Sequence, residues 1–410
     1  MNRMDCIVAA SVVYIKSVGK AQMASTSLPD EILLKIFSYF GPDDLCNISK
    51  VCIRWRKVAQ DVQLWKKHSY SFDVFSYPKT INEVLTVATA LDSLIISSRS
   101  DAPRILRTLF RKCGYLRKLR VMNCRLGEGV TGLVEKIVDL YPNLQVLSLE
   151  ECGPLPLDIF KLIPRLTELR ELKLTSTQEL HEDIICPLVD RCQKLKKLCL
   201  LGVKMDDASV LYIITKLGRQ LLTLMLNGAL LTDVVYLHFH NCPRLQELEV
   251  TSCTRMRDRG LLEGIGSLQE LTSLKLSSLT LHFPTTTLIE FYHQSFMSPL
   301  VLLNLSGSSY LNDECLNEIA ERCKHLKDLT LCLNDDVTDA GMRSVITHCN
   351  QLRVLNLAFL SSITGGFLRL VPSHLPHLRR LVLRMCDNVH VRHIQNLQAA
   401  LPGLNIKRIV

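Results

Sequence analysis

Cysteine and histidine are the side chains of this sequence with the clearest potential for chemistry. The chain has 16 cysteines and 12 histidines, and His348 and Cys349 are adjacent. Thiolates and imidazoles at tetrahedral spacing bind zinc, and paired thiols in a secreted protein form disulfides. However, no C-x-x-C pair occurs in the sequence, and His348 has no partner at zinc-ligand spacing. We therefore expect no metal site and no cofactor.

The cysteines instead occupy recurring positions. One position lies three residues before a leucine-rich motif, and different copies place different residues there: Cys113, Cys192, Cys242, Cys323 and Cys349, but Tyr141, Leu166, Leu268 and Leu375 elsewhere. Because leucine can neither bind a metal nor form a disulfide, this is an apolar packing position. A second such column holds Cys124, Cys152, Cys253 and Cys386. Stacked columns could still bring Cys124 within disulfide range of Cys152.

Sequence signatures of catalysis are missing from the chain. There is no glycine-rich phosphate loop, no G-x-S-x-G and no H-E-x-x-H. Cys52 or Cys199 would need an activating base to serve as a nucleophile, and the pattern puts both in packing or strand positions. We expect no catalytic residues and a protein that is not an enzyme.

The leucine-rich motif L-x-x-L-x-L sets the period of the chain. Thirteen copies follow one another at intervals of 23 to 29 residues, starting at Leu91, Leu116, Leu144, Leu169, Leu195, Leu221, Leu245, Leu271, Leu300, Leu326, Leu352, Leu378 and Leu401. Apolar residues that alternate with polar ones at the end of each copy predict a short strand. Self-similarity at this period is typical of solenoid proteins.

Each strand is preceded by a segment with helical spacing of its apolar residues. In DECLNEIAERC these are Leu316, Ile319, Ala320 and Cys323, which share one face of a helix. A unit of one strand and one helix cannot bury its apolar face alone, so neighbouring units must stack. The sequence predicts an α/β horseshoe over residues 81–410, with about 13 units of about 26 residues, parallel strands inside and helices outside.

Residues 27–69 break this period and predict a small all-α module. A first helix carries an apolar stripe that includes Ile32 and Ile36, Gly41 and Pro42 end it, and both tryptophans of the chain, Trp55 and Trp65, follow. About 45 residues is small for an independent core. The module could therefore bury part of its surface on a partner, or it could cap the first repeat, and the pattern alone favours neither.

The stretches LPDEILLKIFSYF, DLCNISKVCIRW and LWKK resemble an F-box, with Phe40 where leucine is commoner. The repeats resemble the cysteine-containing subclass of leucine-rich repeats. We expect a disordered leader at 1–24, and the resemblance implies an F-box at 25–69, followed by a linker at 70–80 and leucine-rich repeats at 81–410. It also predicts a set of adaptor-binding residues: Leu28, Pro29, Ile32, Leu33, Ile36, Phe37, Leu45, Val51, Cys52, Trp55, Leu64 and Trp65.

An F-box followed by leucine-rich repeats resembles the substrate receptors of SCF-type ubiquitin ligases. The resemblance implies binding to a Skp-type adaptor, and through it to cullin and RING subunits, while the solenoid holds a protein substrate. Polar residues between the inward leucines of the strands are the candidates for substrate binding: Lys118, Arg120, Glu247, Glu249, Lys275, Asn304, Asn356, Arg380 and Arg384.

A basic run between residues 103 and 120 contains Arg104, Arg107 and Arg111 on one helix face, with Lys118 and Arg120 on the next strand. Arginine clusters bind phosphorylated or acidic segments through paired hydrogen bonds. The plainer interpretation is a solvated outer face. Because the helix and the strand face opposite sides of the horseshoe, the two sets need not form one patch.

Two other functions compete with a ligase receptor. The chain could bind an adaptor without promoting ubiquitin transfer, as a scaffold or a sequestering protein. It could also be a secreted repeat protein with disulfides, which the cysteine count and the signal-like stretch CIVAASVVYI at 6–15 would fit. That stretch is too short to span a bilayer, and a net charge of +9 is modest for a nucleic-acid-binding protein. We expect a cytoplasmic or nuclear protein with neither a membrane nor a nucleic acid as partner.

Overall fold

Four short helices begin the part of the chain that the structure describes. The structure is a computed structural model, and it describes residues 28–279, 283–308 and 310–408. The helices are α2 (Asp30–Phe37), α3 (Pro42–Ile48), α4 (Ile53–Ala59) and α5 (Val62–Trp65). Side-chain caps fix two of their starts, since the Cys52 thiol accepts the Trp55 N–H and the Asp61 carboxylate accepts the Gln63 N–H. The leader expected at 1–24 and the stretch at 6–15 lie outside the described residues.

A curved parallel sheet of 14 strands follows, and the strands pair in chain order. Its members are β1 (Ser69–Phe72), β2 (Ser93–Ser97), β3 (Lys118–Met122), β4 (Val146–Glu150), β5 (Glu171–Thr175), β7 (Lys197–Leu201), β9 (Thr223–Asn227), β10 (Glu247–Thr251), β11 (Ser273–Leu276), β12 (Leu302–Asn304), β13 (Asp328–Thr330), β14 (Val354–Asn356), β15 (Arg380–Val382) and β16 (Asn405–Lys407). Two further short strands, β6 (Glu179–Leu180) and β8 (Lys204–Met205), pair separately.

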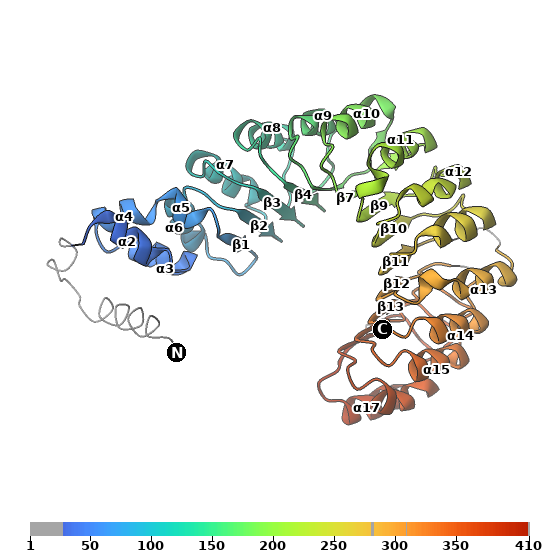
Figure 1. The fold of residues 1–410 in the computed structure, drawn as a ribbon. Helices are drawn as coiled ribbons and strands as arrows, with labels where there is room; N and C mark the ends of the chain where they lie inside the picture. The colour runs from blue at the N-terminus through green and yellow to red at the C-terminus, as the bar shows by residue number, and fades with distance from the viewer. Residues whose placement is uncertain (1–27, 280–282, 309, 409–410) are drawn as a thin grey trace.

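Helices cover the outer side of this sheet (Figure 1). They are α6 (Pro78–Val87), α7 (Ala102–Lys112), α8 (Val130–Leu140), α9 (Leu157–Leu162), α10 (Glu182–Arg191), α11 (Asp207–Leu217), α12 (Asp233–Leu237), α13 (Thr285–His293), α14 (Asp313–Arg322), α15 (Asp339–His348), α16 (Val371–His374) and α17 (Val391–Ala400). Short 3₁₀ turns complete several repeats at Ile163–Arg165, Gly218–Gln220, His238–Asn241, Ile265–Ser267, Ser295–Met297 and Gly366–Leu370, and a π turn spans Gly260–Gly264.

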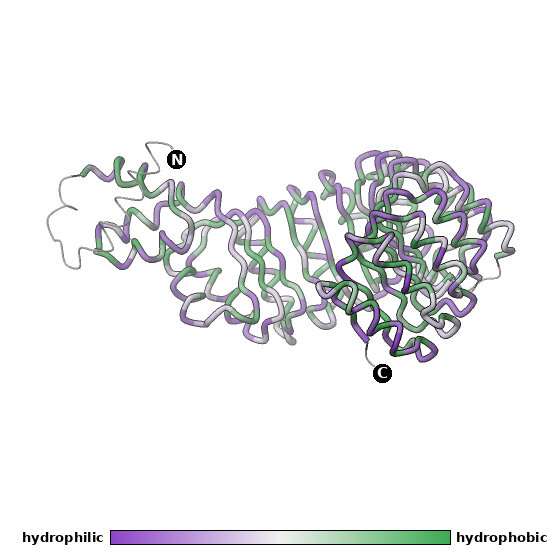
Figure 2. Tube along the Cα trace, turned by 90° about the horizontal axis from the view of Figure 1, so that it is seen from below, coloured by the Kyte–Doolittle hydropathy of each residue, from purple (hydrophilic) through white to green (hydrophobic). Residues whose placement is uncertain are grey.

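Register places leucine opposite leucine at one strand position from β2 to β15. Leu329 pairs with Leu303 on one side and with Leu355 on the other, and all three side chains are fully buried. Hydrophobic residues consequently recur in every repeat along the chain rather than gathering at one end (Figure 2). The α/β solenoid predicted from the sequence, with strands inside and helices outside, is confirmed.

Aspartates at the helix starts bond each of several repeats to the next. The carboxylates of Asp313 and Asp339 accept the backbone N–H of the threonine 25 residues further on, Thr338 and Thr364, each at 2.9 Å. The threonine hydroxyl donates to the same carboxylate. These charge-assisted bonds fix neighbouring repeats relative to one another at their outer rim.

The sheet begins earlier than the leucine pattern indicates. Residues 70–80, expected as a linker, include most of strand β1 and the beginning of helix α6. Strand β1 pairs with β2 from Ser69 to Phe72, and Phe72 is fully buried. Tyr70 and Phe72 stand opposite Leu94 and Ile96 of β2, so aromatic residues take the positions that aliphatic residues fill there, and the motif is not visible at this point of the sequence.

Cysteines of the two predicted columns are buried packing residues. The Cys192 thiol donates to the carbonyl of Leu166 in the preceding repeat at 3.6 Å, and Cys323 donates to Met297 at 3.4 Å. Burial raises the pKa of Cys192, Cys242 and Cys349 to about 12. All fifteen cysteines of the described residues are free thiols. Among the residues with a described structure, His348 bonds only within its own helix, to Ser344 and Thr347.

A thiol titration tests this packing. Without reductant, we expect the denatured chain to release 16 reactive thiols. Among the cysteines of the described residues, we expect the half-buried thiols of Cys52, Cys186 and Cys332 to react first in the native protein at neutral pH, because the fully buried ones carry almost no thiolate. Mostly oxidised cysteines in the purified native protein would instead support the secreted, disulfide-containing alternative.

Candidate functional site

Helix α2 divides its apolar residues between two faces. Leu33 and Phe37 are buried, and the Phe37 ring meets the Trp55 ring edge-on, with 5.4 Å between the centroids. On the other face Ile32 is exposed and Ile36 is half-buried. The inner face builds the core of the small module, and the outer face remains open to a partner.

An ion pair brings the start of α4 beside the start of α2. The Arg54 side chain bonds to the Asp30 carboxylate at 2.7 Å and also to the Leu28 carbonyl oxygen. The neighbouring side chains Val51 and Ile53 are therefore held at the same end of the module as Leu28 and Ile32. These four side chains are between 40% and 73% exposed, and we call them the module surface.

The twelve residues predicted to bind an adaptor fall into two groups. Leu33, Phe37, Leu45, Trp55, Leu64 and Trp65 are buried within the chain, so they shape the module from inside. Leu28, Pro29, Ile32 and Val51 are exposed, whereas Ile36 and Cys52 are half-buried. Sequence reasoning missed Ile53, the most exposed member of the module surface. Its only sequence signal is its place at the start of α4, two residues before the buried Trp55.

The module also packs on the first repeat. The Tyr70 hydroxyl of β1 donates to the Asp43 carboxylate of α3 at 2.6 Å, and Lys50 bonds to Glu83 of α6 at 2.8 Å. Beneath these contacts, Trp65 and Phe72 belong to one continuous buried core. The structure thus combines the two alternatives, since the module covers the end of the solenoid and still leaves the module surface exposed.

The inner face of the sheet carries the residues predicted to bind a substrate. Most of its charges already pair within the chain: Lys118 with Asp92 at 3.0 Å, Arg120 with Glu171 at 3.2 Å, Lys275 with Glu249 at 2.9 Å, and Glu247 with Lys197 at 4.0 Å. The side-chain oxygens of Asn304 and Asn356 accept nearby backbone N–H groups. Within the described residues, Arg380 and Arg384 are the members of the predicted set whose side chains form neither a hydrogen bond nor an ion pair, although Asp328 interacts electrostatically with Arg380.

The basic run between residues 103 and 120 is split between two faces. Arg104, Arg107 and Arg111 are exposed on the outer side of α7. On the inner side, Lys118 and Arg120 are held by Asp92 and Glu171. The arginines and the strand residues therefore form no common patch, which favours the interpretation of a solvated outer face.

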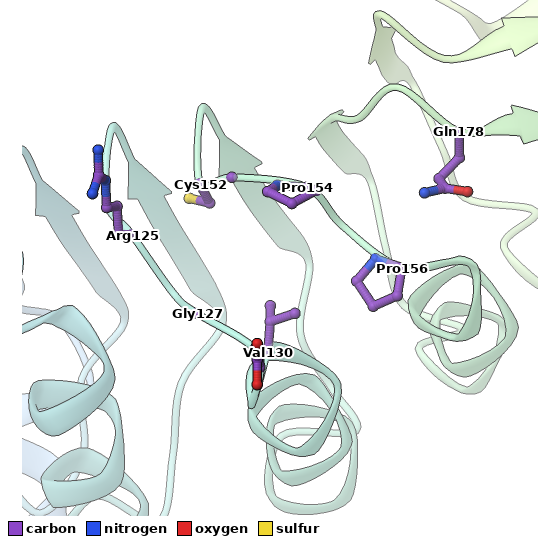
Figure 3. Close-up of a pocket in the computed structure, with 9 residues that line it drawn as sticks. Arg125, Gly127, Val130, Cys152, Pro154, Pro156 and Gln178 are labelled. Carbon is purple, nitrogen blue, oxygen red and sulfur yellow. The ribbon is translucent and has the colours of Figure 1, made fainter.

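A hollow of about 560 Å³ lies where the loops after β3 and β4 approach α8 and the segment after β5 (Figure 3). Glycine, proline, valine and Cys152 line it together with the polar residues Arg125, Glu128 and Gln178. Within the described part of the chain, no group of three or more histidine, cysteine, aspartate or glutamate side chains is placed to hold a metal ion. No helix of that part is long and apolar enough to cross a membrane.

Comparisons with known proteins agree with this architecture. A family model described as F-box-like matches residues 25–71. F-box/LRR-repeat protein 12 of Homo sapiens is 26% identical over 304 residues, which cover 70% of this chain and 84% of the relative. F-box/LRR-repeat protein 5 of Mus musculus is 47% identical over 92 residues, which cover 21% of this chain and 12% of the relative.

A solved structure shares the overall fold. A chain from the crystal structure of the Rad7 and Elc1 complex in yeast superposes with a TM-score of 0.54 at 14% sequence identity, covering 99% of this chain and 92% of that chain. At this identity the likeness concerns the fold alone. The F-box-like match, the named relatives and the geometry above show an F-box-like module followed by leucine-rich repeats, the arrangement of the F-box and leucine-rich-repeat proteins that this chain resembles.

Proposed function

We propose that the chain is the substrate-recognition subunit of an SCF-type ubiquitin ligase. In this proposal a Skp-type adaptor docks on the module surface and links the chain to cullin and RING subunits, while the solenoid holds a protein substrate. The observation that carries the proposal is the division within the F-box-like module. Its core is filled by its own side chains, yet Leu28, Ile32, Val51 and Ile53 remain exposed together.

Exposed apolar side chains in one place favour a protein partner. Burying a leucine, isoleucine or valine contributes roughly 1.5–3 kcal/mol each, and a few well-buried anchors account for most of the affinity of an interface. The adaptor would supply the apolar groove that these side chains lack. The Arg54–Asp30 pair holds the starts of α2 and α4 together. It thereby keeps these side chains side by side for the adaptor.

The mechanism we propose is proximity. A bound substrate has its lysines held near a ubiquitin-charged enzyme of the complex, which raises their effective concentration. The chemistry of transfer belongs to other subunits, and this chain contributes position and orientation. The contacts from Tyr70 to Asp43 and from Lys50 to Glu83 support this role, because they fix the module against the solenoid. Such a complex would act in the cytoplasm or the nucleus.

A charge on the module surface tests the docking. In Ile32→Asp we expect co-purification with a Skp-type adaptor to fall by at least about a hundredfold, because burying an unpaired carboxylate costs several kcal/mol. The matched control is Val234→Asp, at a similarly exposed position on the outer helix α12. Both variants should keep the wild-type melting temperature. Undiminished adaptor binding by a folded Ile32→Asp protein would contradict the assignment of the surface.

Recruitment of cullin separates a ligase receptor from a sequestering protein. The purified chain is mixed with adaptor, cullin and RING subunits, and the complex is sized by light scattering after gel filtration. We expect all four proteins to elute together, because the adaptor joins this chain to the scaffold. A stable complex of chain and adaptor that excludes cullin would favour the scaffold or sequestering alternative.

A further inference from the structure

One backbone position in the turns after the strands adopts positive φ along much of the solenoid. It lies three residues after strand residues that pair with one another in register, such as Asn304, Thr330 and Asn356. Seven repeats place small, polar or glycine residues there: Ser98, Asn123, Glu151, Gly202, Ser252, Ser278 and Gly307. The last three positions of this kind hold Leu333, Phe359 and Met385, with φ of 59°, 61° and 52°.

Large apolar residues are poorly suited to this position. The left-handed region brings Cβ close to the following carbonyl oxygen, so glycine and asparagine adopt it most readily. In addition, Leu333, Phe359 and Met385 are 58%, 46% and 47% exposed, so their side chains gain little from the core of the chain. Residues held in uncommon backbone conformations without a packing reason point to function.

The three side chains form one continuous strip. They belong to successive repeats, whose strands pair in register from Thr330 through Asn356 to Val382. Neighbouring strands lie about 4.8 Å apart, so the strip is about 10 Å long. The ladder continues beneath it, since the Leu333 N–H donates to the Ala358 carbonyl at 3.2 Å and the Phe359 N–H to the Arg384 carbonyl at 2.8 Å. We call these residues the Leu333 strip.

Charges border this strip on both sides. Arg380 and Arg384 are exposed on the sheet side, and neither has an ion pair among the described residues. On the loop side, the Asp335 carboxylate accepts the Ser361 hydroxyl at 2.8 Å, and Asp387 is exposed. Asp328 of β13 offsets part of the charge of Arg380, so a partner segment that covers the strip meets positive charge, mainly that of Arg384, where it faces the sheet.

We propose that the Leu333 strip and the two arginines bind an amphipathic helix of a partner protein. Residues i and i+7 of a helix lie about 10.5 Å apart, so an apolar stripe at i, i+3 or i+4, and i+7 matches the strip, as in helix-in-groove recognition. Acidic residues beside that stripe pair with Arg380 and Arg384. If the proposed function holds, this helix belongs to the substrate; the binding itself does not depend on the adaptor.

A displayed library of random 16-residue peptides tests the proposal on the full-length protein. Peptides that also bind the triple variant Leu333→Ser, Phe359→Ser, Met385→Ser are removed by counter-selection. Serine is the replacement because Ser98 and Ser252 occupy the same turn position in other repeats. We expect peptides with the apolar stripe and with Asp or Glu beside it. Synthetic copies should lose at least tenfold in affinity for the triple variant, and the acidic ones should also weaken with Arg384→Ala.

Matched controls keep the test interpretable. Leu140→Ser with Val234→Ser removes exposed apolar side chains from the outer helices and should leave affinity unchanged. The melting temperature of the triple variant should not fall, because serine occupies the same turn position in other repeats. If the melting temperature falls, the single variant Phe359→Ser replaces the triple variant in the test. Enrichment of basic or purely polar peptides, or of peptides that bind the variant equally, would overturn the proposal.

Two further outcomes separate this inference from neighbouring ones. Self-association of the wild-type chain that the triple variant abolishes would assign the strip to a second copy of the chain and overturn the proposal. Conversely, Ile32→Asp should bind the selected peptides with unchanged affinity. Peptide binding by a chain that recruits no adaptor would therefore leave the strip assignment intact while the ligase role fails.

Discussion

Leucine stacked on leucine across the parallel sheet is the interaction on which everything else in this protein depends. No repeat has enough apolar surface facing itself to form a core, so each strand and helix gains its burial from its neighbours. Leu329, fully buried between Leu303 and Leu355, shows the arrangement. This constraint spreads the core over the whole length of the chain and leaves one long inner face available for binding.

The first repeat extends the same stacking to the F-box-like module. Trp65 and Phe72 join the module core to that of the solenoid, and the Tyr70–Asp43 and Lys50–Glu83 contacts cover the junction. The proposed proximity role depends on such a junction, because a flexible connection would lower the effective concentration of whatever the solenoid holds. The module surface and the Leu333 strip lie at opposite ends of one connected curve (Figure 1).

Sequence reasoning predicted the repeats well, because a period of 26 residues with leucine at fixed places has one physical explanation. It also predicted that Cys192 and Cys349 are packing residues, since leucine substitutes for them in other repeats. It could not divide the F-box residues into interior and exterior: Trp55 and Ile32 are both apolar, and only the three-dimensional packing shows that the first is buried and the second exposed. Nor could it reveal that Tyr70 and Phe72 replace the aliphatic residues of the motif in β1, that Asp92 already holds Lys118, or that Phe359 adopts positive φ.

The central claim is that the module surface, and not the solenoid, carries the adaptor. Electron cryomicroscopy of the chain bound to a Skp-type adaptor and a cullin scaffold tests it most directly. The account predicts adaptor density over Leu28, Ile32 and Ile53, with the inner face of the sheet uncovered and facing the open side of the complex. An adaptor seated on the inner strands, or one that contacts only the outer helices α7 to α17, would contradict it.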